Sequence, residues 1–397
     1  MSGDPVSLVG REAVLDVDGV AHGGHCVARW DGRVVFVRHT LPGERVRVLV
    51  TEGDETSRFL RADAVEVLDA AVGRTQPPCP HAGPGRCGGC DFQHVTPSRQ
   101  RELLGAVVQE QLQRLAGLEV DVTVRAVPPD DLGWRTRVGW TVGPAGVGLR
   151  RHRSHAVEPV DRCYIAHPTV AVPPHPPAGV ERLDAAVSSE GDSSVLADGR
   201  PLEGRARLVE RVRDREFRVS GAGFWQVHPM AAQTLVEAVL ELGRPASGEH
   251  AVDLYAGVGL FSVFLGELVG SPGRVVSVEG GAVAVRDARR NLHDQPQVEI
   301  VHAPVEQALA AGRAGERADL VVLDPPRTGA RAAVVRRIAA MRPGRVVYVA
   351  CDPAALARDV ATFARLGYRL TDLQAFALFP MTSHVECVAL LTPVQHR

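Results

Sequence analysis

Residues 251–265 read AVDLYAGVGLFSVFL: a short apolar run, a loop with two glycines, and a second apolar run. The first run has the length of a buried strand, and the second begins a helix whose N-terminal amides face the loop. Gly257 and Gly259 allow a tight turn and close approach of a ligand to the backbone. A lone G-x-G is weak evidence, but its place between a strand and a helix predicts the first unit of a ligand-binding α/β sheet.

The chain continues this alternation of strands and helices to its C-terminal end. The seven predicted strands are 250–254, 274–279, 298–302, 319–323, 345–350, 368–378 and 384–392. Strands that alternate with helices at this spacing predict a seven-stranded, doubly wound sheet over residues 221–397. A ligand of such a sheet binds beyond the carboxyl ends of its strands.

Acidic residues end two of these strands. Glu279 ends the second, about 20 residues beyond the glycine loop, where a carboxylate can bind two ribose hydroxyls. Asp324 ends the fourth, in LVVLDPPRTGA, where two prolines stiffen the turn. Ser262 stands where a dinucleotide site needs a third glycine, so S-adenosylmethionine fits better than NAD. The alternative for Glu279 is a solvated side chain without a ligand, and the alternative for the two prolines is a rigid turn without a role in binding.

The N-terminal half divides into two regions. Residues 1–68 alternate short apolar runs with turn residues, which predicts a small all-β barrel. Residues 69–220 are less regular, with a cysteine cluster, a helix near 100–115, β-like segments near 135–149 and a Pro-rich loop or linker over 172–201. Arginine-rich runs at 149–155 and 205–218 are either solvated faces or RNA phosphate contacts.

Composition limits the partners. The net charge of the 397-residue chain is −2, which argues against nucleic-acid binding through bulk charge. All 45 basic residues are arginine, by codon bias or because planar guanidinium groups suit phosphates and base edges. The N-terminus lacks a signal-peptide pattern and no apolar run approaches the ~18 residues of a membrane span, so we expect a cytoplasmic protein. Seven cysteines without a secretory signal make a disulfide framework unexpected.

Seven motifs, in order along the chain, resemble the S-adenosylmethionine-dependent RNA uracil-C5 methyltransferases. They are GGHCVARWDGRVVFVRHTLPGERV, CGGCDFQHV, FWQVHP, DLYAGVGLFS, LDPPRTG, YVACDPAALARD and FPMTSHVECVALL. The resemblance implies a TRAM-type (OB-like) RNA-binding barrel, a mixed α/β middle domain and a class I Rossmann-like methyltransferase domain. It also implies RNA as partner, with ribosomal RNA favoured over transfer RNA, and no obligate protein partner is evident.

The resemblance also assigns two catalytic residues. Uracil C5 is a poor nucleophile until a thiolate adds at C6, and a base must later remove the C5 proton. By resemblance Cys351 is the nucleophile and Glu386 is the base. The residues themselves favour this for Cys351, because Asp352 can cap and Pro353 can begin a helix whose N-terminus lowers a thiol pKa. Glu386 on its own could equally lie in an ordinary edge strand, and Cys387 beside it is expected in packing.

Further residues match binding positions of the family. Gln226, Tyr255 and Asp324 match cofactor positions. Gly257 and Glu279 are also predicted to bind the cofactor, because of their places in the glycine loop and at the end of the second strand. The cysteine cluster, Cys79, Cys87, Cys90 and the distant Cys163, could hold zinc or an iron–sulfur cluster on spacing alone. The resemblance favours [4Fe-4S], with unliganded thiols as the alternative, while Cys26 is expected in the barrel core.

Two other functions stay open at this point. One is methylation of a different RNA atom, which would not need the paired thiol and carboxylate. The other is a non-catalytic RNA-binding protein that keeps a cofactor pocket for structure. In the favoured function the target base must leave its stack, because a thiol has to reach one face of the ring.

Overall fold

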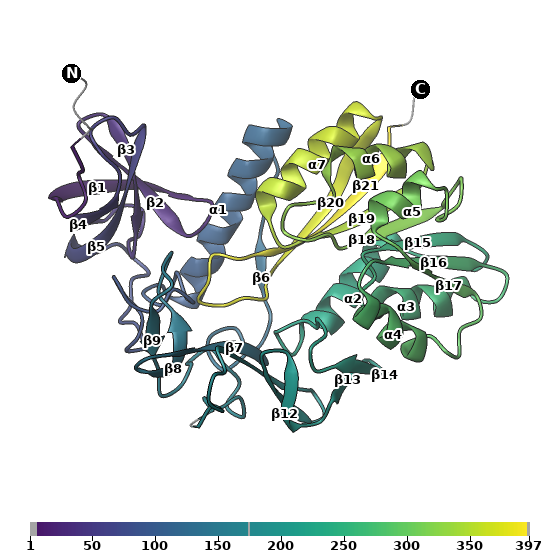
Figure 1. Ribbon diagram of the computed structural model, residues 1–397. Coiled ribbons are helices and arrows are strands. Elements are labelled where there is room, and N and C mark those ends of the chain that lie inside the picture. Colours follow the sequence, from purple (N-terminus) through teal and green to yellow (C-terminus); the bar gives the residue numbers. More distant parts are fainter. Residues whose placement is uncertain (1–5, 174, 395–397) are drawn as a thin grey trace, which may run out of the picture.

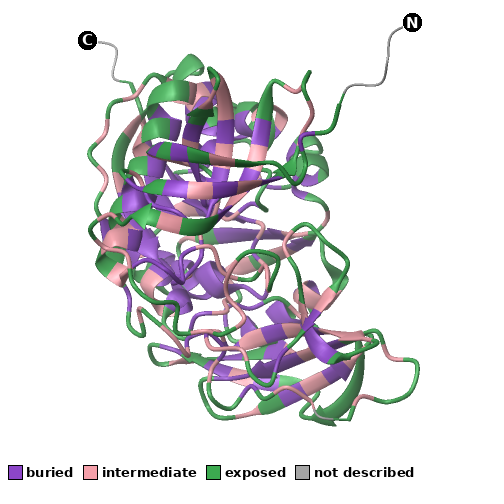
Figure 2. Ribbon diagram, turned by 90° about the vertical axis from the view of Figure 1, so that its left-hand side faces the viewer, coloured by how far each residue is buried: buried purple, intermediate pink, exposed green. Residues whose placement is uncertain are grey.

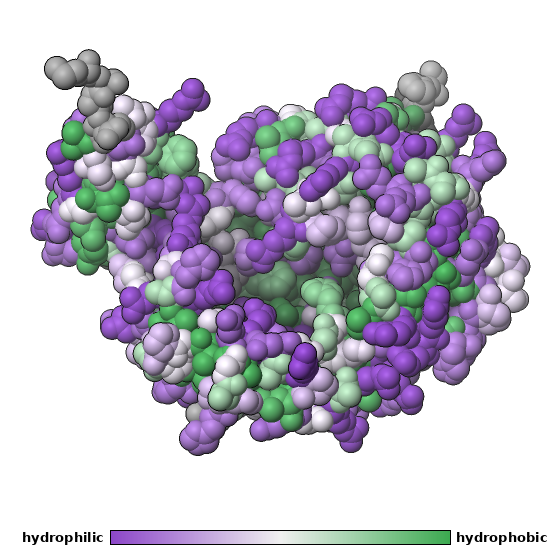
Figure 3. Space-filling view, viewed as in Figure 1, coloured by the Kyte–Doolittle hydropathy of each residue, from purple (hydrophilic) through white to green (hydrophobic). Residues whose placement is uncertain are grey.

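The computed structural model describes residues 6–173 and 175–394 and shows three parts (Figure 1). An N-terminal barrel lies on one side, an α/β part on the other, and a middle part connects them from below. The space-filling view shows a hollow between the three parts (Figure 3). In the described ranges, no helix is both long and apolar enough to span a membrane.

The predicted barrel is confirmed as a closed sheet with strand order β1-β2-β3-β5-β4. Its strands are β1 (Glu12–Ala21), β2 (His25–Trp30), β3 (Arg33–Arg38), β4 (Arg45–Glu52) and β5 (Phe59–Asp69). Alternating apolar residues fill the interior, including Cys26, which is 2% exposed as expected of a core residue. The β1–β2 turn, residues 22–24, extends from the barrel toward the α/β part.

The middle part begins with helix α1 (Pro97–Ala116), close to its predicted position. A six-stranded antiparallel sheet follows, in the order β12-β11-β10-β7-β8-β9. Its strands are β7 (Arg137–Gly143), β8 (Gly146–Arg150), β9 (Val157–Pro159), β10 (Arg182–Val187), β11 (Ser193–Ala197) and β12 (Arg200–Gly204), and a separate hairpin holds β13 (Arg207–Val212) and β14 (Arg215–Ser220). The predicted linker over 172–201 is therefore wrong, because β10, β11 and the start of β12 lie inside it.

The α/β part contains all seven predicted strands. They are β15 (His250–Leu254), β16 (Arg274–Glu279), β17 (Val298–His302), β18 (Leu320–Leu323), β19 (Arg345–Ala350), β20 (Tyr368–Ala377) and β21 (Glu386–Pro393). The helices are α2 (Ala231–Gly243), α3 (Leu260–Val269), α4 (Ala282–Asn291), α5 (Val305–Ala310), α6 (Arg331–Ala340) and α7 (Pro353–Arg365). Two apolar clusters, one on each face of the sheet, confirm the doubly wound fold. The central strands are almost wholly buried, and Figure 2, viewed from the barrel side, shows exposed residues mainly along the outside of the molecule.

The sheet has one strand more than predicted. The strand order is β17-β16-β15-β18-β19-β21-β20-β6, and β6 (Val124–Ala126) comes from the middle region. It pairs parallel to β20 at the sheet edge. Helix α1, just before β6, packs against α7 in the same apolar cluster. The α/β part is thus completed by residues from the N-terminal half.

Candidate active site

The direction of β21 brings two predicted catalytic residues together. Strands β15 to β19 are parallel, whereas β21 runs antiparallel to β19. The first residue of β21, Glu386, therefore lies at the edge where the parallel strands end. Ala350 pairs with Cys387, so the next residues along this ladder, Cys351 and Glu386, are neighbours across two strands.

The glycine loop is shaped by its backbone and by Glu279. Tyr255, Gly257 and Gly259 all have positive φ, at 63°, 58° and 88°. The Glu279 carboxylate accepts hydrogen bonds from the amides of Gly257 (2.9 Å) and Gly281 (2.5 Å). A Cβ on Gly257 would have no neighbouring atom within 4 Å. The loop is therefore held open beside Glu279, as the predicted cofactor site requires.

Asp253, an acid inside the first apolar strand, lies at the same edge and was not among the predicted site residues. Asp253 is fully buried, and its Oδ2 accepts a 2.5 Å hydrogen bond from Ser262, whose hydroxyl also lies 2.9 Å from the hydroxyl of Ser277. Its Oδ1 has no hydrogen-bond partner among the described residues. The hydroxyl at 262 thus holds a carboxyl group at the cofactor edge, a role that a third glycine could not fill. The sequence signal that could have identified Asp253 is an acidic residue within an otherwise apolar run.

Carboxyl groups dominate the electrostatics of this edge. Burial raises the pKa of both Asp253 and Asp324 to about 7. Burial, followed by the Asp324 carboxyl, raises the pKa of Glu386 well above its ordinary value. A cationic ligand would relieve this repulsion between like charges. S-Adenosylmethionine carries a sulfonium and an ammonium group, so the donor set fits the cofactor that the sequence predicts.

The surroundings of Cys351 oppose the activation by its helix that the sequence predicts, and this activation stays a prediction. Burial, Glu386 and Asp324 together raise the pKa of the Cys351 thiol to about 12. Asp352 does cap α7, as predicted, by accepting a 2.7 Å hydrogen bond from the amide of Ala355. Burial, the largest of these causes, and the two neighbouring carboxyl groups therefore oppose the effect of the helix N-terminus on this thiol.

Arg327 is a second residue that the sequence analysis missed. Its guanidinium favours the charged forms of Cys351 and Glu386 and so opposes the rise in the pKa of each. It donates to Nε2 of His384, 3.1 Å away, and burial, followed by Arg327 itself, lowers the pKa of His384. Arg327 lies within LDPPRTG, which was the available signal.

Gln226 is another predicted cofactor residue. It lies half-buried between β14 and α2. Its neighbour Trp225 packs against Phe217, which in turn contacts Phe264 of α3. The segment thus lies near the helix that follows the glycine loop, and the role of Gln226 stays a prediction.

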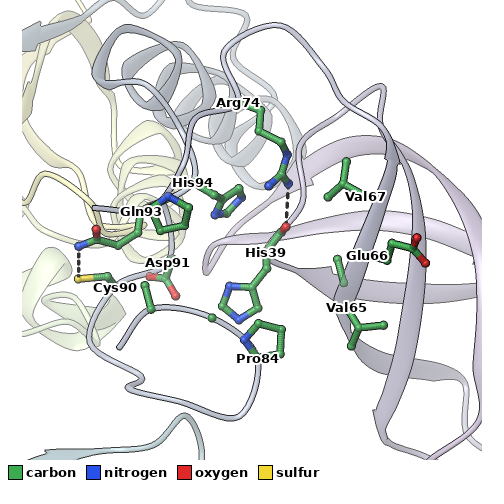
Figure 4. A pocket seen from close by; sticks show the side chains of 14 residues that line it. His39, Val65, Glu66, Val67, Arg74, Pro84, Cys90, Asp91, Gln93 and His94 are labelled. Atoms are coloured by element: carbon green, nitrogen blue, oxygen red, sulfur yellow. Dashed lines mark hydrogen bonds between the residues drawn. The ribbon is translucent and has the colours of Figure 1, made fainter. Parts of the chain in front are cut away.

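The four predicted metal ligands line one cavity of about 310 Å³. Burial is the main cause that raises the pKa of each thiol, and the thiols of Cys79 and Cys163 further raise the pKa of Cys87 and Cys90. Gln93 donates to the sulfur of Cys90 at 3.4 Å (Figure 4). However, no group of three or more His, Cys, Asp or Glu side chains in the described ranges is arranged to hold a metal ion. The cysteines are together, but the predicted metal site is not confirmed.

Two family models match the chain. The TRAM domain matches residues 6–65, and the tRNA (Uracil-5-)-methyltransferase family matches residues 205–394. These matches coincide with the barrel and with the α/β part that carries the site.

Relatives match over nearly the full length. A Streptomyces coelicolor protein described as an uncharacterized RNA methyltransferase is 48% identical, over 98% of this chain and 94% of its own. The 23S rRNA (uracil(1939)-C(5))-methyltransferase RlmD of Acinetobacter baylyi is 31% identical, over 95% and 93%. Among solved structures, the Pyrococcus abyssi tRNA (uracil-54, C5)-methyltransferase in complex with S-adenosyl-L-homocysteine shares the fold, with a TM-score of 0.72, 23% identity and coverage of 95% and 99%. The chain therefore belongs to the S-adenosylmethionine-dependent RNA uracil-C5 methyltransferases.

Proposed function

We propose that this enzyme methylates C5 of a uridine in ribosomal RNA, with Cys351 as nucleophile and Glu386 as general base. The observation that carries the proposal is the pairing of β19 with β21, which places these two residues side by side at the carboxyl edge. S-Adenosylmethionine, when bound, supplies the methyl group that C5 attacks.

The proposed chemistry uses the two residues in turn. The Cys351 thiol, which is half-exposed, gives its proton to solvent, and the sulfur then forms a bond to C6. The electron pair of the C5–C6 double bond moves toward C5 and makes C5 nucleophilic. After methylation, Glu386 takes the proton from C5. The double bond then re-forms and the sulfur–C6 bond breaks, which releases the enzyme. A raised pKa makes the Glu386 carboxylate a stronger base for this step.

We propose that Gln226, Tyr255, Gly257, Glu279 and Asp324 bind the cofactor. The open glycine loop and the buried carboxyl groups support this assignment. We also propose that residues 1–68 and 69–220 contact the RNA and that residues 221–397 carry out the reaction. The boundary at residue 220 does not separate the two parts completely, because strand β6 of the middle region pairs with β20 in the sheet of residues 221–397.

Ribosomal RNA is favoured because relatives of that specificity match almost the full chain at 31% identity. Transfer RNA is the second candidate, because the structural neighbour with the same fold is a tRNA methyltransferase. In a strain that lacks this gene, we expect one 5-methyluridine to disappear from 23S ribosomal RNA when total RNA is mapped. The gene should restore it, and the gene encoding Cys351→Ala should not. Loss from transfer RNA alone would favour the second candidate instead.

We further propose that Cys79, Cys87, Cys90 and Cys163 bind a [4Fe-4S] cluster. Zinc bonds to sulfur are about 2.3 Å long, so four thiolates around zinc lie about 3.8 Å apart, whereas a cluster spreads its ligands more widely. The observation that supports a shared ligand here is that all four thiols line one cavity. Methyl transfer needs no redox step, so the cluster would stabilise the middle part.

The cluster can be tested on protein purified without oxygen. We expect iron and sulfide, about four of each per chain, and a visible absorption that dithionite bleaches. Cys163→Ser should lose iron and lower the melting temperature. Cys26→Ser, at a buried barrel thiol outside the cavity, should keep the iron. Stoichiometric zinc, or no bound metal in the parent chain, would refute the assignment.

A further inference from the structure

The β1–β2 turn of the barrel reaches the residue that follows the nucleophile. Nε2 of His22 lies 3.0 Å from Oδ2 of Asp352. The other oxygen of the same carboxylate, Oδ1, accepts the hydrogen bond from the amide of Ala355 in the first turn of α7. One carboxylate therefore joins the barrel turn to the helix that begins immediately after Cys351.

The same turn also packs on the segment that leads to Glu386. Gly24 has a φ of 77°, and a Cβ there would lie 2.8 Å from Cβ of Asp91 and 2.9 Å from Cβ of Ser383. Only glycine fits at this distance. The amide of Ser383 in turn donates to Oδ2 of Asp91 at 3.1 Å. The turn thus contacts the two chain segments that carry the nucleophile and the base.

The barrel is also held by contacts with the chain segment that follows it. Arg74, after the barrel, donates to the buried Glu44 (2.7 Å) and to the carbonyl oxygen of His39 (2.8 Å), as seen for His39 in Figure 4. Arg38 of β3 also pairs with Asp91, at 3.5 Å. These partly buried contacts hold the barrel against the segment that follows it, which includes Asp91, and so limit the movement of its turn.

We propose that His22 is a positioning residue of the methyltransferase reaction, which holds Asp352 and through it the start of α7 and the Cys351 sulfur. The proposal rests on the proposed function of Cys351. Hydrogen bonding to His22 fixes the Asp352 side chain in the rotamer that caps the helix. Without it, the carboxylate gains rotational freedom next to the reacting sulfur, and small misplacements of reacting groups cost large factors in rate.

The test uses the full chain with His22→Ala and His22→Gln. Single-turnover formation of the covalent complex with 5-fluorouridine RNA should be about tenfold slower in His22→Ala at saturating RNA. The dissociation constant for RNA should change less than about twofold. His22→Gln should recover part of the rate, because its side-chain amide can donate to Asp352. Hydrogen exchange at the amide of Ala355 should be faster in His22→Ala.

The matched control is His293→Ala, which removes an exposed histidine that follows α4, and neither rate nor exchange should change. An unchanged rate with weaker RNA binding would overturn the proposal, since His22 would then be an RNA contact. Unchanged exchange at Ala355 would also overturn it. A parent chain that forms no covalent complex would instead refute the role of Cys351, and the exchange measurement would still decide the His22 contact.

Discussion

Replacing Cys351 with alanine is expected to lower 5-methyluridine formation by roughly 10⁴-fold or more, the scale seen when a covalent catalyst loses its nucleophile. Without sulfur at C6, the C5 atom of uracil stays a poor nucleophile, whatever the position of the methyl donor. The measurement is mass spectrometry of nucleosides from a ribosomal RNA transcript incubated with enzyme and S-adenosylmethionine. The same variant should form no covalent complex with 5-fluorouridine RNA.

Cys387→Ala is the matched control, because it removes a thiol from the neighbouring strand. Cys387 is fully buried and pairs with Ala350, one position before Cys351. Its loss leaves a small cavity that costs about 1 kcal/mol of stability, and the folded variant should keep its activity. Methylation by Cys351→Ala at the parent rate would exclude a covalent mechanism.

The parallel strands could be predicted from sequence because they are buried on both faces. Such strands are near-continuous runs of valine and leucine, as in β19, whose predicted and observed bounds agree. β6 has only three residues and exists as a strand through its pairing with β20, so no local pattern could show it. The strands over 182–204 were missed because Ser, Asp, Glu and Gly interrupt their apolar residues and predict turns, and every residue of β12 is exposed.

The site was predictable where a residue ends a strand, as Glu279 and Asp324 do. The carboxyl ends of parallel strands lie at one edge of the sheet, so residues that end different strands are expected to lie close together there. Glu386 needed the family resemblance, because only the reversed direction of β21 places its first residue at that edge. His22 could not be found from sequence, since its contact with Asp352 depends on how the barrel sits against the sheet.

The second large effect is expected for Glu386→Gln, which should slow turnover by about 10²- to 10⁴-fold. Glutamine keeps the shape of the side chain but cannot take the C5 proton. Bond formation at C6 should survive, because Glu386 is one of the groups that raise the pKa of Cys351. The variant should therefore stop after methyl transfer and accumulate a covalent complex with ordinary, unfluorinated RNA.

A labelled methyl group distinguishes a reaction that stops after methyl transfer from one that stops before it. When the cofactor carries a radioactive methyl group, the label should migrate with the protein–RNA complex on a denaturing gel. Glu299→Gln changes an exposed acid of the same sheet, paired with Arg274 at 2.6 Å, and should turn over normally without a trapped complex. A trapped Glu386→Gln complex that lacks the label would place the defect before methyl transfer, and release of methylated RNA at the parent rate would assign proton removal to another group. Of the neighbouring carboxyl groups, Asp324 would then be the candidate, because it also raises the pKa of Cys351 and of Glu386.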